Sequence, residues 1–205
     1  MASEAETIKL LLVGDEKCGK TTFLSYELHC GRVHVADSRD RRLSAGENVN
    51  PIPLLRDIDQ PFIFKANFAE KSYRLEFYDT SSPENWRLLD PDMVVICYDI
   101  SQRLSLLSMK RYWIDEVKKS FPRIDGLPIV VLGLKRDLRS ETDPNGIIYP
   151  QEAYQMAQSL RADRYVECSA FTGELIKLAF EDICSTAVDT TKAAGGQSEG
   201  GCTIL

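Results

Sequence analysis

The stretch IKLLLVGDEKCGKTTFLSYELH, residues 8–29, decides the fold. It opens with an apolar run that ends in a glycine. The next residues, GDEKCGKT at 14–21, satisfy the pattern G-x-x-x-x-G-K-[ST], and helical spacing of apolar residues follows them. This pattern binds phosphate when it lies between a strand and a helix, so the context predicts a strand, a phosphate-binding loop and a helix.

The residue types in this loop suit a chain of phosphates. Successive backbone N–H groups and a helix N-terminus surround the phosphates, Lys20 adds positive charge, and the hydroxyl of Thr21 can ligate Mg²⁺. Asp79 ends a later strand-like run and can hold the same metal through a water. We therefore expect Thr21 and Asp79 at the metal, and nucleotide contacts from Asp15, Glu16, Lys17, Cys18, Gly19, Lys20, Thr21 and Thr22.

The rest of the chain alternates strand and helix patterns. PFIFKANF (61–68) and SYRLEFYD (72–79) predict a hairpin, and MVVICYDI (93–100) and LPIVVLG (127–133) are continuous apolar runs typical of parallel strands. Helical spacing recurs between the last two of these runs, and again from about residue 151 to 160 and from about 174 to 188. The sequence therefore predicts an α/β fold of the P-loop NTPase type, a mostly parallel six-stranded sheet with one antiparallel edge strand and about five helices.

Length and composition set the limits of the domain and its partners. The 205 residues predict one domain over 1–188, with a long irregular loop at about 31–60 and a flexible tail at 189–205. A net charge of -6 argues against nucleic-acid binding. Six scattered cysteines without a C-x-x-C pair predict neither disulfides nor zinc, and with no signal-like N-terminus they fit a cytoplasmic protein.

Two further strand ends carry groups that suit a guanine base. GLKRD (133–137) and ECSA (167–170) each follow a buried run. The carboxylate of Asp137 can accept hydrogen bonds from the ring N–H and the exocyclic amine of guanine, which adenine does not offer in that arrangement. The stem of Lys135 can lie along the base, and the backbone at Ser169 and Ala170 can meet the guanine carbonyl. Each motif alone is an ordinary strand-end loop, and only their order with the phosphate loop favours a guanine nucleotide.

The order GDEKCGKT, YDT, GLKRDLR, ECSA and a terminal CTIL resembles a Ras-superfamily small GTPase. RYWIDEVKKSFP (111–122) and KRDLR are similar to the Rho family. The resemblance covers nearly all of residues 8–188 and is thin between 31 and 60, the extended first-switch region. It implies a monomer that binds GTP or GDP with Mg²⁺ and signals by binding protein effectors through its switch regions.

The sequence departs from this family where the last phosphate is cleaved. The family reads D-T-A-G-Q-E where this chain reads DTSSPE, residues 79–84. Ser82 replaces the glycine that meets the γ-phosphate, and Pro83 replaces the glutamine that orients the attacking water. Proline has neither a side-chain amide nor a backbone N–H, so we expect no catalytic residue at Pro83.

Three other departures point the same way. Glu16 stands in place of a glycine beside the expected γ-phosphate and obstructs an arginine finger. No threonine lies between Thr22 and Thr80, so the first-switch sensor of the γ-phosphate is missing, and its place falls near Asp57. Leu134 opens the base motif in place of Asn or Thr. We expect an atypical member of the family that hydrolyses GTP very slowly or not at all.

The terminal CTIL places Cys202 in a C-a-a-X arrangement, where a last leucine favours a geranylgeranyl group. The tail ahead of it holds only Lys192 as a base, and one lipid alone attaches weakly and reversibly. We expect exchange between the cytoplasm and the cytosolic face of membranes, aided by a lipid-shielding partner. Elsewhere, RRLS at 41–44 is either a kinase site at Ser44 or an ordinary basic loop.

Two alternatives stay open at this point. A scaffold that has lost nucleotide would explain Glu16, Leu134 and the missing first-switch threonine, whereas the intact Lys20, Thr21 and Asp137 argue against it. A P-loop kinase acting on a small metabolite would share the phosphate loop but would need neither LKRD, nor ECSA, nor a prenylation box.

Overall fold

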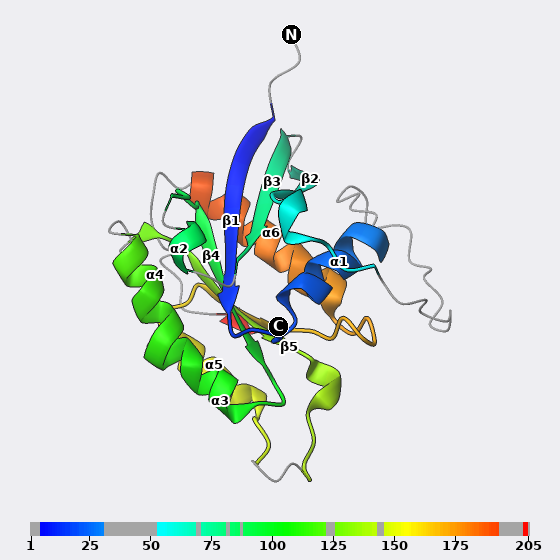
Figure 1. The fold of residues 1–205 in the computed structure, drawn as a ribbon, viewed down its shortest axis with the longest axis vertical. Coiled ribbons are helices and arrows are strands. Elements are labelled where there is room, and N and C mark those ends of the chain that lie inside the picture. The colour runs from blue at the N-terminus through cyan, green and yellow to red at the C-terminus, as the bar shows by residue number, and fades with distance from the viewer. Residues whose placement is uncertain are drawn as a thin grey trace.

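The apolar runs of the sequence form the middle of a single sheet (Figure 1). The structure is a computed structural model that describes residues 5–30, 53–68, 71–80, 83–86, 88–121, 126–142, 146–192 and 203–204. Its seven strands follow the order β2-β3-β1-β4-β5-β6-β7. They are β1 (Glu6–Gly14), β2 (Phe62–Phe68), β3 (Lys71–Asp79), β4 (Met93–Asp99), β5 (Ile129–Leu134), β6 (Arg164–Glu167) and β7 (Thr203–Ile204).

All neighbouring strands run parallel except β2, which pairs antiparallel with β3 through partners such as Phe64 and Leu75. Every second residue of β2 is exposed because this strand is an edge with one face in water, whereas all seven residues of β4 are buried. The predicted hairpin and the six-stranded mixed sheet are thus confirmed. β7 adds a two-residue strand at the edge beside β6.

Helices cover both faces of the sheet (Figure 1). α1 and α6 lie on one face, and the run α3–η2–α4 lies with α5 on the other. Pro150 opens α5 at a position that needs no backbone N–H. The helical elements are α1 (Lys20–Cys30), α2 (Pro83–Trp86), α3 (Arg103–Ser108), the π-helix η2 (Met109–Trp113), α4 (Ile114–Ser120), α5 (Pro150–Ser159) and α6 (Ile176–Lys192), with 3₁₀ turns η1 (Asp57–Asp59) and η4 (Arg136–Leu138).

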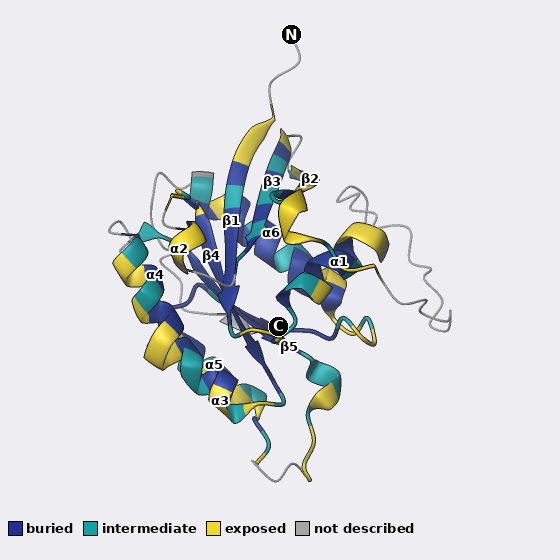
Figure 2. Cartoon of the chain, viewed as in Figure 1, coloured by how far each residue is buried: buried dark blue, intermediate teal, exposed yellow. Residues whose placement is uncertain are grey.

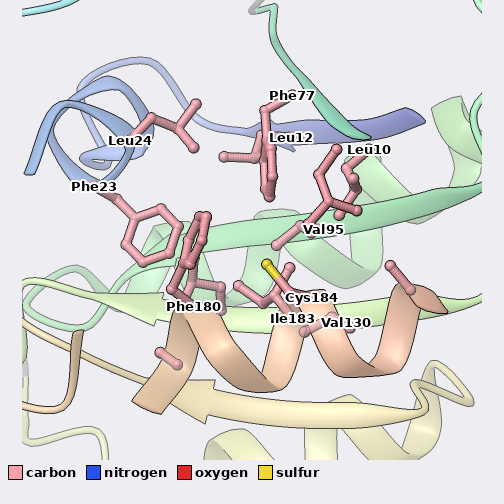
Figure 3. Close-up of a cluster of buried hydrophobic side chains, with 14 of the residues drawn as sticks. Leu10, Leu12, Phe23, Leu24, Phe77, Val95, Val130, Phe180, Ile183 and Cys184 are labelled. Atoms are coloured by element: carbon pink, nitrogen blue, oxygen red, sulfur yellow. The ribbon is translucent and has the colours of Figure 1, made fainter. Parts of the chain in front are cut away.

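The core lies in two layers, one on each side of the sheet (Figure 2). On the α1 and α6 side, Phe180 stacks on Phe77 of β3 with ring centroids 5.4 Å apart and also meets Phe23 of α1. Figure 3 shows Ile183 and Cys184 pointing from the same helix into this layer. This packing fixes the start of α1 relative to the carboxyl ends of β1 and β3.

Two described elements fall at or within the predicted tail, whose flexibility remains an expectation. Helix α6 runs to Lys192, past the expected end near residue 188, and the hydroxyls of Thr186, Thr190 and Thr191 donate to carbonyls one turn back at 2.7 Å. Thr203 and Ile204 pair with β6. Residues 193–202, with Cys202, and the loop with Ser44 lie outside the described residues. Among the described helices, none is long and apolar enough to span a membrane.

Glu27 is a buried acid between α1 and α6, with 3% of its surface exposed. Burial, and then the charge of Glu181 on α6, raise the pKa of Glu27 to about 7, while Lys177 opposes them. The native state therefore holds this proton more tightly than the unfolded chain does. Its contribution to stability is full below about pH 4.5 and is lost as the pH rises to about 7.

We predict that Glu27→Gln raises the free energy of unfolding by about 2 to 4 kcal/mol at pH 8 and by much less at pH 4.5. Urea denaturation of both proteins at the two pH values measures this difference. Glu6→Gln, at an exposed position of β1, is the matched control and leaves stability unchanged at both. A gain of equal size at both pH values would contradict the assignment of the buried charge.

Candidate nucleotide-binding site

The predicted phosphate loop turns between β1 and α1 as the sequence indicates. Gly14 has a φ of 146°, and a Cβ there would lie 2.2 Å from the carbonyl oxygen of Cys97 on β4, so the loop can start only from glycine. Lys17 adopts a left-handed φ of 62° inside the loop. Glu16 and Lys17 are exposed, whereas Cys18 is buried, and its burial raises the pKa of its thiol despite the nearby Lys20. The loop thus presents backbone and charged groups while its thiol stays protonated.

Lys20 and Thr21 begin α1 and point to two different partners. The ammonium of Lys20, 6% exposed, donates to the carbonyl oxygens of Gly14 at 2.9 Å and Asp15 at 3.0 Å. The hydroxyl of Thr21 donates to the carboxylate of Asp79 at 2.5 Å. Burial raises the pKa of Asp79, the bond from Thr21 and the charge of Lys20 lower it, and the charge of Asp57 adds to the rise.

This pair of oxygens fits the Mg²⁺ that the family implies. Mg²⁺ takes oxygen ligands and keeps several waters, so one hydroxyl and one carboxylate next to a phosphate site suffice on the protein side. Among the residues that the structure describes, no group of three or more His, Cys, Asp or Glu could hold a metal. The fit therefore rests on Thr21 and Asp79, as the sequence predicts.

The base motifs and the phosphate loop line one cavity of about 400 Å³. From the phosphate loop and the start of α1 come Gly19 and Thr22, and from the ends of β5 and β6 come the predicted Lys135, Asp137 and Ala170. The remaining walls are apolar and comprise Leu134, Leu138 and Phe171. An apolar cleft with one carboxylate next to a phosphate loop can take the base of a guanine nucleotide.

Ser169 holds the base motifs together from beneath the cavity. Its side chain is fully buried, and its hydroxyl donates to the carboxylate of Asp137 at 2.5 Å. The same oxygen accepts the backbone N–H groups of Phe171 at 3.2 Å and Thr172 at 3.1 Å. The sequence predicts a backbone contact from Ser169, and the structure adds a side-chain role in aiming Asp137.

Lys135 is aimed by a residue that sequence reasoning missed. Its ammonium contacts Asp99 at the end of β4, 2.7 Å away, while its left-handed φ of 60° turns the chain from β5 into η4. Its side chain passes Gly19, where a Cβ would lie 3.8 Å from the Lys135 Cε and 3.6 Å from Leu134. An apolar contact from Leu134 thus replaces the polar side chain usual in the family. The sequence did offer one signal for Asp99. It is an acidic residue at the end of a buried strand, and that strand end lies on the same edge of the sheet as the phosphate loop.

Gln60, which sequence reasoning also missed, is hydrogen-bonded to the last residue of β3. Its amide nitrogen donates to the Asp79 carbonyl at 2.6 Å, and its amide oxygen accepts the Asp79 N–H at 3.1 Å. The hydroxyl oxygen of Ser25 on α1 accepts a hydrogen bond from the N–H of Leu55 at 3.0 Å. This bond holds the last part of the first-switch region against α1. Both contacts cross long sequence separations, so no local pattern signals them.

The roles expected of Ser82 and Pro83 beside the γ-phosphate remain predictions. Ser82 lies outside the described residues. Pro83 opens α2, a position where a missing backbone N–H costs the helix nothing.

The comparisons with known proteins agree with this arrangement. Residues 59–189, more than half of the chain, match the Ras family, and the chain belongs to that family. It is similar to the GTP-binding protein RHO2 of Saccharomyces cerevisiae, with 27% identity over 216 residues that cover 100% of both chains. The resemblance to a Rho-type small GTPase is thereby confirmed. The phosphate loop at 14–21 lies ahead of the family match, so its assignment rests on its pattern and geometry.

We predict that Ser169→Ala lowers the free energy of unfolding by about 1 to 2 kcal/mol, because it removes a buried hydroxyl that serves three partners. Urea denaturation measures the loss. Ser159→Ala, which removes an exposed hydroxyl bonded to the Met156 carbonyl, is the control and changes stability by less than about 0.5 kcal/mol. Equal effects of the two substitutions would contradict the role given to Ser169.

Proposed function

We propose that this chain is a Rho-like guanine-nucleotide-binding signalling protein that retains GTP, cleaves it very slowly and acts by binding protein effectors. The observation that supports this most is the single cavity shared by Gly19 and Thr22 with Lys135, Asp137 and Ala170. The family match and the similarity to RHO2 support the same proposal.

In the proposed function each chemical role has a residue of its own. Asp137 accepts the two N–H donors of guanine, Ser169 keeps that carboxylate aimed, and Lys135 flanks the base with its stem. Lys20 leaves the loop carbonyls for the phosphates, and Thr21 and Asp79 provide oxygens on the metal side. Mg²⁺, when bound, neutralises phosphate charge.

Slow cleavage follows from what Pro83 lacks. An oriented water and an arginine finger together are worth about 10³ to 10⁵ in rate, or roughly 4 to 7 kcal/mol of barrier. Pro83 offers no amide to orient a water, and the exposed Glu16 places negative charge and bulk at the loop. The GTP-bound form is therefore long-lived in the proposed function, and control passes to abundance, localisation or modification.

Membrane attachment is the second half of the proposal. A geranylgeranyl group at Cys202 would give weak, reversible binding to the cytosolic face of membranes, and a lipid-shielding partner would keep the chain in solution between encounters.

A nucleotide-free scaffold is the second candidate, and one observation favours it. The ammonium of Lys20 is hydrogen-bonded to the carbonyls of Gly14 and Asp15, and the hydroxyl of Thr21 to Asp79, so these polar groups have partners without a nucleotide. Mass spectrometry of the nucleotide released from purified protein separates the two. GTP or GDP near one per chain supports the proposal, and an empty site supports the scaffold.

We predict that single-turnover GTP hydrolysis is slower than is ordinary for the family, and that Pro83→Gln raises it by at least about 10-fold by returning a water-orienting amide. Pro83→Ala is the matched control, because it removes the ring without adding an amide, and its rate stays near that of the parent chain. Ordinary family rates in the unsubstituted protein would overturn the proposal of impaired hydrolysis.

We predict that Asp137→Asn weakens GTP binding about 100-fold, because two hydrogen bonds to a carboxylate are lost, and improves binding of xanthosine triphosphate, which carries a carbonyl in place of the exocyclic amine. Calorimetric titration with the two nucleotides measures both effects. Asp115→Asn, exposed on α4, is the control and changes neither affinity. Unchanged GTP affinity in Asp137→Asn would remove Asp137 from the base site.

A further inference from the structure

The connector between β3 and β4, residues 80–92, is fastened at both of its ends. At the first, Gln60 exchanges two hydrogen bonds with the backbone of Asp79. At the second, the N–H of Asp92 donates to the Lys9 carbonyl at 2.9 Å, and the N–H of Lys9 donates to the Asp92 carboxylate at 2.8 Å. The family uses this connector as its second switch, so what holds its middle decides whether it can move.

Trp86 holds the middle. It is the last residue of α2, and only 1% of its surface is exposed. Its ring lies 6.4 Å from the ring of Trp113 and meets Phe121 edge to face at 5.9 Å, within the layer that covers Leu11 of β1. Its carbonyl accepts the N–H of Leu89 at 2.8 Å, which continues the turn after α2. An indole buries one of the largest apolar surfaces of any side chain, so α2 cannot leave without exposing it.

Trp113 joins this contact to the phosphate loop. It ends the π-helix η2, and its indole N–H donates to the carboxylate of Asp15 at 2.7 Å. A π-helical turn shifts the residues that follow it around the helix axis and is frequent at functional sites. The path from the phosphate loop to α2 therefore runs through Asp15, Trp113 and Trp86 and needs no atom of a nucleotide.

We propose that Trp86 is a latch that holds α2 in one position whether GDP or GTP is bound. A ligand moves an equilibrium only by interacting differently with its two states. Pro83 lacks the side-chain amide of the glutamine that it replaces, whereas the buried ring of Trp86 holds α2 under every ligand. The inference deepens the proposed function, on which its nucleotide states rest.

The latch has a consequence for partners. Leu88 follows α2 and is 95% exposed, so it is an apolar group presented at a fixed place. A protein partner that reads this surface meets the same shape in both nucleotide forms. Discrimination between the forms must then come from the first-switch side of the site.

Hydrogen exchange of the full chain loaded with GDP or with a non-hydrolysable GTP analogue tests the latch. The amide of Leu89 is the reporter because it is bonded to the Trp86 carbonyl. We expect its exchange rate to agree within about twofold between the two forms. A difference of about 10-fold or more in the unsubstituted chain overturns the proposal.

Two substitutions separate the latch from simple packing. Trp86→Ala should speed exchange at Leu89 by about 10-fold or more and make it depend on the nucleotide. Trp86→Phe is the matched control: it keeps an aromatic ring and removes an indole N–H that has no partner among the described residues, so slow exchange is retained. Slow exchange that persists in Trp86→Ala, or is lost in Trp86→Phe, overturns the role of the buried ring.

A fluorescence measurement covers the case in which Trp86→Ala fails to fold. The chain has 2 tryptophans, so in Trp113→Phe all indole emission comes from Trp86. Resistance to acrylamide quenching with either nucleotide supports the latch, and quenching that changes with the nucleotide overturns it. If purified protein holds no nucleotide and binds none, the proposed function fails. The same quenching in that protein then shows whether Trp86 is buried without any ligand.

Discussion

The close contact between Gly14 and the backbone of Cys97 is the constraint on which the candidate nucleotide-binding site depends. A side chain at residue 14 would overlap the β4 carbonyl, so the chain can leave β1 only with glycine there. That exit places Lys20 under the loop carbonyls and lets the N–H of Phe23 bond the carbonyl of Gly19 at 3.0 Å, which begins α1. The aromatic layer around Phe180 then fixes the other side of α1. The steric limit at Gly14 and the aromatic layer around Phe180 together position the phosphate loop, the start of α1 and the hydroxyl of Thr21.

The base side of the site has a rigid support of its own. Tyr98 and Tyr165 share a hydrogen bond of 2.9 Å, Tyr165 donates to Glu167, and Arg139 grips Glu167 with two bonds of 2.8 and 2.5 Å. Arg139 also donates to the Ile148 carbonyl at 2.9 Å, which ties down the segment before α5. A buried polar network of this kind is costly unless every member finds a partner, and when satisfied it specifies one geometry. The ends of β5 and β6 are therefore held in place before any base enters.

Sequence reasoning succeeded where the physics is local. The phosphate loop, the hairpin and the buried parallel strands follow from glycine positions and apolar periodicity within short windows, and the base motifs sit at strand ends that the alternation predicts. It failed where partners are distant along the chain. Asp99, Gln60 and Trp113 each act through a contact to another element, at Lys135, Asp79 and Asp15 respectively. The sequence also offers no signal for the pairing of Thr203 and Ile204 with β6, because that pairing depends on the open edge of a distant strand.

The rigid parts of the site all address what GDP and GTP have in common. Under the proposed function, Asp137 meets the base, and Lys20, Thr21 and Asp79 face the phosphates and the metal that GDP and GTP share. Ser82 and Pro83 replace the glycine and the glutamine that the family places at the last phosphate, and in the proposed latch the burial of Trp86 holds α2. A ligand that binds two conformational states with equal affinity does not shift the equilibrium between them, however tightly it binds. Under the proposed function, the contacts of the site hold the nucleotide and do not move α2 in response to it. A slow or absent cleavage step therefore removes little from the signal.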